Sequence, residues 1–386
     1  MVGSRGRGPV DRWQRAAPRS LTAGKRGSYN PRAPRVRHGA KIMSMERQPH
    51  SIAVIGAGAW GTALAHHLSR HVGQVTLWAY EQAVVESIGR TRENAMFLPG
   101  VSLHSGLQAT CSLATALRGC TLIVFAVPSH VAGSVLRQAA EVMSAPCPII
   151  SATKGIEEAS LRLMSEVMTE TVLKGRRDWC TVLSGPSFAA EVAHGQPTAI
   201  TLAGTDTDLV RRLQQLLMTP SFRVYAATDL CGVQLGGSLK NVIALAAGVV
   251  DGLNLGHNAR AALITRGLAE MIRLGLAMGA DPRTFYGLSG VGDLVLTCTG
   301  PASRNHRVGV RLGQGESLEQ ITGSMRSVAE GIRTARAAAG LAQRHGVEMP
   351  IVREVCAVLF DKKPCRQAVA DLMERGAKEE LAHFES

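Results

Sequence analysis

The stretch Ser51–Ala65, SIAVIGAGAWGTALA, decides the fold of the first half of the chain. Residues of strand character run directly into a Gly-x-Gly-x-x-Gly motif, and an alanine-rich helical pattern follows. Gly56 permits the tight turn, Gly58 leaves room for a pyrophosphate beside the backbone, and Gly61 lets the helix pack close to the strand. The pyrophosphate would meet the free N–H groups and the positive dipole end of a helix that begins near Ala59. We therefore predict a dinucleotide-binding turn here, rather than a tight turn that binds nothing.

Strand-like and helix-like segments alternate regularly after this turn, as they do in doubly wound α/β folds. Strand signals fade after Tyr225, and nearly all of the chain from Asp229 onward has helical character. We predict an α/β Rossmann domain with a doubly wound, mostly parallel sheet over residues 49–228, followed by an all-α C-terminal domain over residues 229–386. The further strands are predicted at residues 74–78, 121–127, 148–153, 180–184, 198–202 and 224–225.

The net charge argues against a nucleic-acid partner once it is located along the chain. The 386 residues carry a formal charge of +13, but residues 1–50 hold twelve Lys and Arg and two acids, so the other 336 residues carry only +3. A basic groove on the folded part is therefore not supported. Residues 1–48 are rich in Arg, Gly and Pro without hydrophobic periodicity, and we predict a disordered tail. It lacks the apolar segment of a secretory signal, which leaves an organellar transit peptide or a translation start at Met43 or Met45 open.

The cysteines and histidines form no recognisable metal or disulfide pattern. Eight cysteines are scattered without a Cys-x-x-Cys pair, which favours reduced thiols in a cytoplasmic enzyme. His67 and His71 are four residues apart, but no carboxylate lies nearby to complete a metal site, and we expect a solvated helix face. No apolar run approaches the ~18–20 residues that cross a bilayer. We therefore expect no metal and no integral membrane protein.

The helical half opens with a helix that carries glycines and a lysine on one face. Asp229 can cap its N-terminus, and Gly232, Gly236 and Lys240 follow at intervals of four residues. Each glycine inside a helix costs about 1 kcal/mol relative to alanine, so such a helix usually needs close approach of a backbone or a ligand. By itself, this segment is equally compatible with tight helix packing and a lysine that reaches solvent.

Two later segments carry charged residues in positions suited to ligand binding. The segment Gly287–Thr299 is rich in glycine and contains one acid, Asp293. Ser303 is a suitable helix cap, with Gly313 as the end of that helix. Arg304 and Asn305 at the helix start would form an anion site, because free N–H groups, a dipole and a guanidinium meet there. Taken alone, the stretch after Gly300 also fits a surface loop.

Eight motifs follow one another along the chain. They are Gly56-Ala57-Gly58-Ala59-Trp60-Gly61-Thr62-Ala63, Ala152-Thr153-Lys154-Gly155, Ser184-Gly185-Pro186-Ser187-Phe188-Ala189, Gly236-Gly237-Ser238-Leu239-Lys240-Asn241, Asn258-Ala259-Arg260-Ala261-Ala262-Leu263-Ile264-Thr265-Arg266-Gly267, Gly292-Asp293-Leu294, Ser303-Arg304-Asn305 and Val328-Ala329-Glu330-Gly331. In order and spacing they cover residues 51–375, and the tail lies outside them. Together they resemble the NAD(P)-dependent glycerol-3-phosphate dehydrogenases of the bacterial type.

The resemblance implies reduction of dihydroxyacetone phosphate to sn-glycerol 3-phosphate, a precursor of glycerophospholipids, with NAD or NADP and no metal. It implies Lys240 as the proton donor and acceptor, with Lys154 and Asp293 as further catalytic residues. Implied substrate contacts are Lys154, Gly185, Ser187, Lys240, Asn241, Asp293, Ser303, Arg304 and Asn305. Implied dinucleotide contacts are Gly56, Gly58, Ala59, Trp60, Gly61, Tyr80, Lys154, Ala189, Arg304, Val328 and Glu330.

Elementary chemistry agrees with this resemblance. Reducing a ketone requires a hydride for the carbon and a proton for the oxygen. Lys240 suits that proton if burial and neighbouring positive charge lower its pKa. Lys154, Lys240 and Arg304 supply three positive charges, against roughly two negative charges on a phosphomonoester and one on Asp293.

The chain departs from the family pattern at two places. Family members often have Thr where Ser187 stands, and a hydroxyl is retained. Many have a basic residue near the end of the second strand, where this chain has Ala79-Tyr80-Glu81. The preference between NAD and NADP stays open, because Glu81 stands where an acid favours the ribose hydroxyls of NAD.

Two other functions remain as alternatives. One is a different two-domain dehydrogenase, acting on a hydroxyacid or a sugar nucleotide, although Ser303-Arg304-Asn305 favours a small phosphorylated substrate. The other is a dinucleotide-sensing module without turnover. A homodimer is possible, and the sequence does not decide it.

Overall fold

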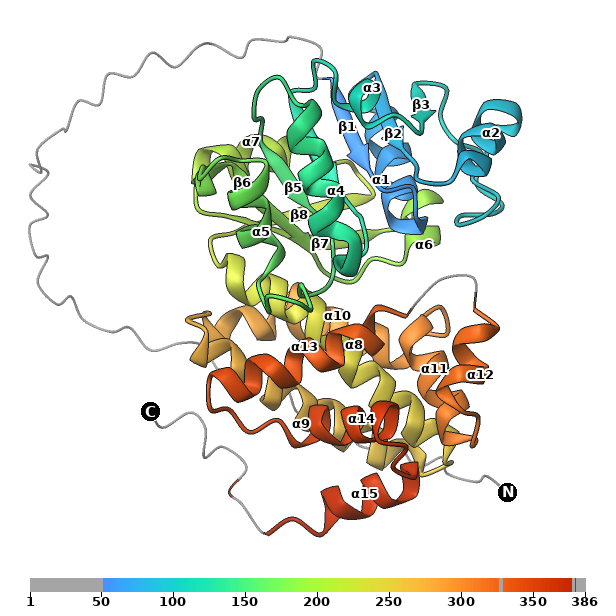
Figure 1. The fold of residues 1–386 in the computed structure, drawn as a ribbon, viewed down its shortest axis with the longest axis vertical. Coiled ribbons are helices and arrows are strands. Elements are labelled where there is room, and N and C mark those ends of the chain that lie inside the picture. Colours follow the sequence, from blue (N-terminus) through green and yellow to red (C-terminus); the bar gives the residue numbers. More distant parts are fainter. Residues whose placement is uncertain (1–50, 326–328, 377–378, 380–386) are drawn as a thin grey trace, which may run out of the picture. The chain divides into compact units, whose positions relative to one another are not determined.

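The computed structural model describes residues 51–325, 329–376 and 379. The predicted tail at 1–48 and Val328 lie outside these residues. The described residues belong to one compact unit of the chain. In it, an eight-stranded sheet with its helices forms the first half, and helices α8–α15 form the second (Figure 1).

The sheet has the strand order β3-β2-β1-β4-β5-β6-β7-β8, and the order reverses between β1 and β4. Neighbouring strands are parallel except for the antiparallel pair β6 and β7. The predicted fold class, a doubly wound and mostly parallel sheet followed by helices, is therefore confirmed. The strands are β1 (Ile52–Ile55), β2 (Val75–Trp78), β3 (Leu107–Thr110), β4 (Leu122–Phe125), β5 (Ile149–Ser151), β6 (Cys180–Ser184), β7 (Thr198–Gly204) and β8 (Phe222–Ala227).

The edge strand β3 is the one described strand that the sequence pattern did not predict. Its four residues are Leu-Gln-Ala-Thr, and only Leu107 is fully buried. A short edge strand with one buried residue carries too little apolar alternation to be distinguished from a loop.

Helices cover both faces of the sheet, and alternate residues of β1 point to opposite layers. Ile52 and Val54 pack in the layer that contains α1, α2, α6 and α7, whereas Ala53 and Ile55 pack in the layer that contains α3, α4 and α5. These helices are α1 (Ala59–Ser69), α2 (Gln82–Thr91), α3 (Leu113–Leu117), α4 (Ser129–Val142), α5 (Met164–Thr171), α6 (Ala189–Ala193) and α7 (Thr207–Leu217).

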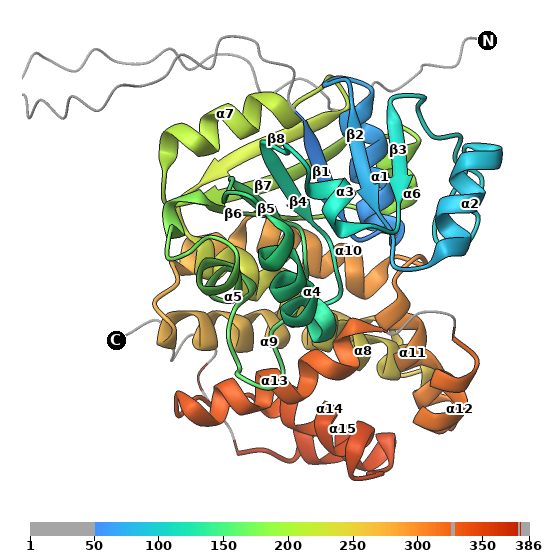
Figure 2. The ribbon, with the colours of Figure 1, turned by 45° about the horizontal axis from the view of Figure 1, so that its top comes forward.

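The helical half is organised around α8, whose residues are buried along almost its whole length. Asp229 caps this helix by accepting from the Gly232 backbone N–H, as predicted. Figure 2 shows the helices of this half gathered on one side of the sheet half. They are α8 (Leu230–Gly252), α9 (Gly256–Ala277), α10 (Asp293–Thr299), α11 (Arg304–Gly313), α12 (Leu318–Gly323), α13 (Glu330–Arg344), α14 (Pro350–Phe360) and α15 (Cys365–Met373), with the short turns η2 (Pro282–Tyr286) and η3 (Leu288–Gly292) before α10.

Glycines bring α8 and α11 into backbone contact. A Cβ atom added at Gly248 would lie 2.1 Å from the carbonyl oxygen of His306, and one added at Gly309 would lie 2.0 Å from that of Leu245. Side chains at these positions would push the helices apart. The glycines therefore fix the position of α11 along α8.

The segment after β5 joins the two halves. Ile156 and Leu163 belong to the buried core of the helical half, although they lie in the sequence of the sheet half. Because Ile156 is two residues after Lys154, the position of Lys154 is tied to the helical core.

Two expectations about single segments are wrong. His67 is only 7 % exposed; its ring nitrogen lies 2.8 Å from the Leu217 carbonyl and the ring packs on Phe222, so only His71 is solvated. Helix α8 is, by length and composition, long and apolar enough to cross a bilayer, whereas no apolar run of that length was expected. Its most apolar window is 94 % buried inside the molecule, as for the core helix of a globular domain.

Candidate active site

The glycine turn after β1 folds as predicted, at the point where the strand order reverses. Gly56 has φ +110°, which favours glycine, and a Cβ at Gly61 would lie 1.9 Å from the Gly56 carbonyl oxygen. A Cβ at Gly58 would meet nothing within 4 Å. Gly58 also precedes the first residue of α1, Ala59, and offers no side-chain cap. The turn thus leaves open space at a helix N-terminus, which fits a dinucleotide pyrophosphate.

Trp60 connects this turn with the lysine that follows β5. The Trp60 indole nitrogen is buried and has no hydrogen-bond partner in the structure. The ammonium of Lys154 lies 5.9 Å from the centroid of the Trp60 ring, within the range of a cation–π contact. The residues predicted to border the cofactor and the substrate therefore meet at this point.

One carboxylate holds both predicted lysines. Asp293, at the first position of α10, accepts from Lys154 Nζ at 3.0 Å through one oxygen and from Lys240 Nζ through the other. Asp293 and Lys240 are 1 % and 5 % exposed. The structure thus brings the three predicted catalytic residues together, from the segment after β5, from α8 and from α10.

The glycine stripe of α8 explains why Lys240 reaches this place. A Cβ at Gly236 would lie 2.3 Å from the Ser289 carbonyl oxygen, so this glycine admits the backbone of η3, just before Asp293. The structure therefore supports close backbone packing as the reason for Gly236. Lys240, however, turns inward to Asp293 and does not reach solvent.

Burial and, to a smaller extent, the nearby charge of Lys154 together lower the pKa of Lys240 to about 7, although the charge of Asp293 opposes the shift. A lysine with this pKa is present in both protonation states near neutral pH. That property suits a group that donates and accepts a proton.

Thr297 is a residue of this site to which the sequence interpretation assigned no role. Its hydroxyl accepts from Lys240 Nζ at 2.9 Å and donates to the Asp293 carbonyl at 2.6 Å. The signal was present, because Thr297 follows Asp293 by four residues and so shares its face of α10.

The loop after β6 brings two more predicted residues to Lys154. The Gly185 carbonyl accepts from Lys154 Nζ at 3.2 Å and from the Ser187 hydroxyl at 2.9 Å, and Ser187 Oγ lies 3.5 Å from Lys154 Nζ. Gly185 has φ +149°, a conformation that residues with side chains rarely adopt.

The segment after Gly300 forms the predicted capped start of α11. Ser303 caps the helix by accepting from the His306 backbone N–H at 3.2 Å, and Arg304 is the exposed first residue. Asn305 is buried and donates to the Asn241 side chain at 2.9 Å. This arrangement is a capped helix start and not an irregular surface loop.

Glu330, the first residue of α13, adds a second acid to the site. Burial raises its pKa to about 7, while the charges of Arg304 and Lys154 and the Ser129 backbone N–H oppose the shift. The charge of Glu330 therefore interacts with the predicted phosphate contact and with the catalytic lysines.

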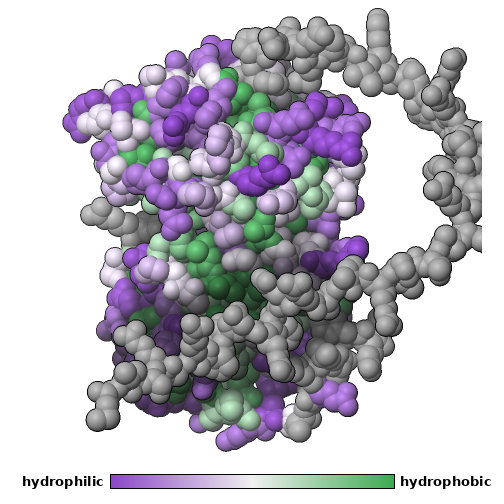
Figure 3. All heavy atoms as spheres, turned by 180° about the vertical axis from the view of Figure 1, so that it is seen from behind, coloured by the Kyte–Doolittle hydropathy of each residue, from purple (hydrophilic) through white to green (hydrophobic). Residues whose placement is uncertain are grey.

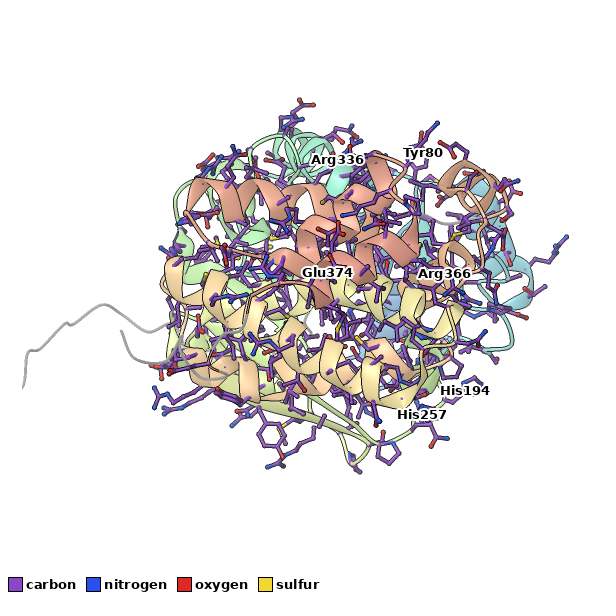
Figure 4. The ribbon with its side chains drawn as sticks, turned by 90° about the horizontal axis from the view of Figure 1, so that it is seen from below. Tyr80, His194, His257, Arg336, Arg366 and Glu374 are labelled. Carbon is purple, nitrogen blue, oxygen red and sulfur yellow. The ribbon has the colours of Figure 1, made fainter. Side chains whose placement is uncertain are left out.

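The other predicted cofactor contacts are less closely tied to this centre. Ala189 begins α6, directly after the Ser187 loop. Tyr80 follows β2, is 81 % exposed, and projects from the edge of the molecule (Figure 4). Among the described residues, no group of His, Cys, Asp and Glu could hold a metal ion. The cofactor roles of Ala189 and Tyr80 stay predictions.

Comparison with known proteins decides the family. Residues 51–210 match the N-terminal model, and residues 229–370 the C-terminal model, of NAD-dependent glycerol-3-phosphate dehydrogenase. A glycerol-3-phosphate dehydrogenase [NAD(P)+] from Geobacter sp. (strain M21) is 51 % identical over 329 residues, which are 85 % of this chain and 98 % of that protein. The chain belongs to the NAD-dependent glycerol-3-phosphate dehydrogenase family.

Solved structures agree with this assignment. The crystal structure of a glycerol-3-phosphate dehydrogenase from Coxiella burnetii is similar with a TM-score of 0.81 and 41 % identity, over 84 % of this chain and 99 % of that one. A ketopantoate reductase from Ralstonia eutropha shares the fold at a TM-score of 0.53 and 15 % identity, over 84 % of this chain and all of that one. The dehydrogenase described here is an NAD(P)-dependent oxidoreductase, and the open turn at Gly58 fits its cofactor.

Proposed function

We propose that this dehydrogenase interconverts dihydroxyacetone phosphate and sn-glycerol 3-phosphate, with Lys240 as the proton donor and acceptor. The observation that carries the proposal is the buried Lys240–Asp293–Lys154 group next to the dinucleotide turn. A ketone becomes alkoxide-like during reduction, and a fixed ammonium can supply both positive charge and a proton at its oxygen.

Each member of this group has a distinct task. The nicotinamide, when bound, supplies or accepts the hydride. In the reducing direction, Lys240 Nζ donates its proton to the carbonyl oxygen and becomes neutral; in the oxidising direction, it takes the proton back. Asp293 and Thr297 hold Lys240 in place, so that its ammonium is oriented before substrate arrives. Lys154 favours the neutral form of Lys240 by charge repulsion.

The substrate phosphate is proposed to bind at the start of α11. The backbone N–H groups of a helix start and the Arg304 guanidinium are both suited to a phosphate. Lys154, protonated Lys240 and Arg304 carry three positive charges, while Asp293 and an ionised Glu330 carry two negative charges. A substrate phosphate brings roughly two more negative charges, and a Glu330 with its pKa near 7 can take up a proton in response.

The cellular role follows from the product. We propose that the enzyme works in the cytoplasm and supplies sn-glycerol 3-phosphate for glycerophospholipids, without a nucleic-acid partner. A homodimer is part of the same proposal: hydrophobic residues gather near the middle of one face (Figure 3), and exposed apolar patches often mark protein–protein contacts. Sedimentation of the full chain measures that assembly state.

The deciding experiment is a spectrophotometric assay of NADH and NADPH oxidation. Dihydroxyacetone phosphate is expected to support turnover, whereas dihydroxyacetone and ketopantoate, which lack the phosphate, are expected to be poor substrates. Turnover with ketopantoate would favour a hydroxyacid dehydrogenase of the same fold. Cofactor binding without oxidation of either cofactor would favour a sensing module.

A further inference from the structure

A chain of three buried groups joins α8, α11 and α13. The side-chain amide nitrogen of Asn305 donates to the side-chain oxygen of Asn241 at 2.9 Å. The side-chain oxygen of Asn305 accepts from the backbone N–H of Gly331 at 3.0 Å. Asn241 and Asn305 are 5 % and 8 % exposed. Both ends of the Asn305 side chain are therefore engaged by the protein itself.

Each of the three bridged residues directly follows a charged residue of the proposed site. Asn241 follows the acid–base residue Lys240, Asn305 follows the phosphate contact Arg304, and Gly331 follows the acid Glu330. Within a helix, fixing one residue closely limits the backbone position of the residue before it. The Asn305 bridge therefore constrains the backbone positions of three charged residues from three helices.

Close packing makes this bridge sensitive to small changes. A Cβ added at Gly331 would lie 2.6 Å from the Asn241 carbonyl oxygen and 2.8 Å from the Asn305 side-chain oxygen. The start of α13 thus approaches α8 and α11 as near as a glycine permits. Because this packing leaves no space for an added atom, we expect a shift of Asn305 to move the start of α13, which carries Glu330.

We infer that Asn305 is a positioning residue that couples the substrate side of the site to its cofactor side. It does so by holding the start of α13, and with it Glu330, against the helices that carry Lys240 and Arg304. This inference rests on the proposed function for its account of the substrate, but its central claim concerns cofactor binding. We claim that Asn305 contributes to NADH affinity even when no substrate is present. A residue that only contacts substrate would not affect NADH affinity under these conditions.

The test is a fluorescence titration of the full chain with NADH, without substrate, followed by steady-state kinetics. Asn305→Ala removes both hydrogen bonds and should weaken NADH binding by about 3–10-fold, as for one or two neutral hydrogen bonds. Asn305→Asp retains the acceptor for Gly331, and the Asn241 amide can turn to donate to it. This variant should bind NADH close to the wild-type level, while its new negative charge raises the KM for dihydroxyacetone phosphate. The matched control is Arg307→Ala, an exposed position on the same helix, which should change neither value.

A double-mutant cycle tests whether the effect passes through Glu330. In a Glu330→Gln background, Asn305→Ala should weaken NADH binding by less than in the wild-type background. Thermal melting of every variant separates a local change from loss of folding. If Asn305→Ala does not fold, the NADH affinity of Asn305→Asp is compared with that of the wild type instead. Three results would each overturn the inference: unchanged NADH affinity in Asn305→Ala, equal loss in Asn305→Asp, or additive effects in the cycle. Failure of the proposed reaction would appear separately, as absent turnover with NADH binding intact.

Discussion

The sheet half and the helical half bring residues to the site in different ways. In the sheet half, the glycine turn, Lys154 and Ser187 follow the ends of β1, β5 and β6. In the helical half, Lys240 stands in the middle of α8, and Arg304 is the first residue of α11. The first arrangement follows from a general rule of parallel sheets, whereas the second depends on how closely particular helices approach. We therefore expect the acid–base group and the phosphate contact to belong to the helical half, and the sheet half to supply the dinucleotide turn and adjust the charge of Lys240.

Substitution of Lys240 should have the largest effect and is the most direct way to break this division. Lys240→Ala should lower kcat by about 10²–10⁴-fold, the usual contribution of a positioned acid or base. NADH affinity, measured by fluorescence, should stay nearly unchanged. Lys240→Arg should restore little activity, because a guanidinium does not release its proton near neutral pH.

Lys154→Ala is the matched variant from the sheet half. If Lys240→Ala keeps a near-normal kcat while Lys154→Ala does not, the acid–base group belongs to the sheet half, and the α8 stripe is only a packing device.

Arg304 should show the next largest effect, mostly on substrate binding. A phosphate is present in the ground state and the transition state alike, so its contact contributes to both. Arg304→Ala should raise the KM for dihydroxyacetone phosphate by about 10–100-fold, as for a charged hydrogen bond, with a smaller fall in kcat from misplacement of the carbonyl. A kcat loss as large as that of Lys240→Ala, at unchanged KM, would contradict the phosphate assignment.

The backbone contact between α8 and α11 can be tested through stability. Gly309→Ala would place a Cβ 2.0 Å from the Leu245 carbonyl oxygen. We expect this overpacking to lower the free energy of unfolding by about 1–3 kcal/mol. The control is Gly89→Ala in α2 of the sheet half, where an added Cβ meets nothing within 4 Å. That change should stabilise the helix by up to about 1 kcal/mol. Denaturant unfolding of both variants measures the difference, and equal changes would remove this contrast between the halves.

The same contrast determines what could be predicted from the sequence. Seven of the eight strands were predictable, because each is an apolar run bounded by turn residues, and the glycine turn carries its own signature. The edge strand β3 was not, since a single buried leucine gives no pattern. His67 was misplaced because periodicity does not reveal that Phe222, far away in sequence, covers one side of α1.

The helical site was predictable only in part. Asp293, Lys240 and Arg304 were identified by motif, yet no spacing in the sequence indicates that one carboxylate holds two lysines. The Asn305 bridge to Gly331 also joins three helices that are distant in sequence. Such contacts depend on tertiary packing, which helix periodicity does not specify.

The pH dependence of the rate distinguishes the proposed tasks of Lys240 and Lys154. The reducing direction needs protonated Lys240, so kcat/KM for dihydroxyacetone phosphate should fall about tenfold per pH unit above the lowered pKa of about 7. In the oxidising direction, which needs neutral Lys240, kcat/KM should rise with pH up to about 7 and then level off. Lys154→Met removes a positive charge that lowers the pKa of Lys240, and should move both transitions to higher pH. Rate profiles of both directions from pH 6 to 10 measure this, and transitions that stay in place in Lys154→Met would show that Lys154 does not adjust the charge of Lys240.

The smallest expected effect concerns the choice between NADH and NADPH. The experiment tests whether the sheet half alone determines this choice. Glu81 follows β2, immediately precedes α2, and makes no side-chain cap to that helix. An acid at this place in a Rossmann domain favours the ribose hydroxyls of NADH and repels the additional phosphate of NADPH. Because Glu81 is only half-buried, its charge should act weakly. We expect Glu81→Arg to shift the ratio of kcat/KM values towards NADPH by about two- to fivefold, the range for a solvent-exposed charge pair. Glu86→Arg, an exposed position on the same helix, is the control and should leave the ratio unchanged. An equal shift in both variants would reflect net charge alone, and an unchanged ratio in Glu81→Arg would show that this carboxylate points away from the ribose.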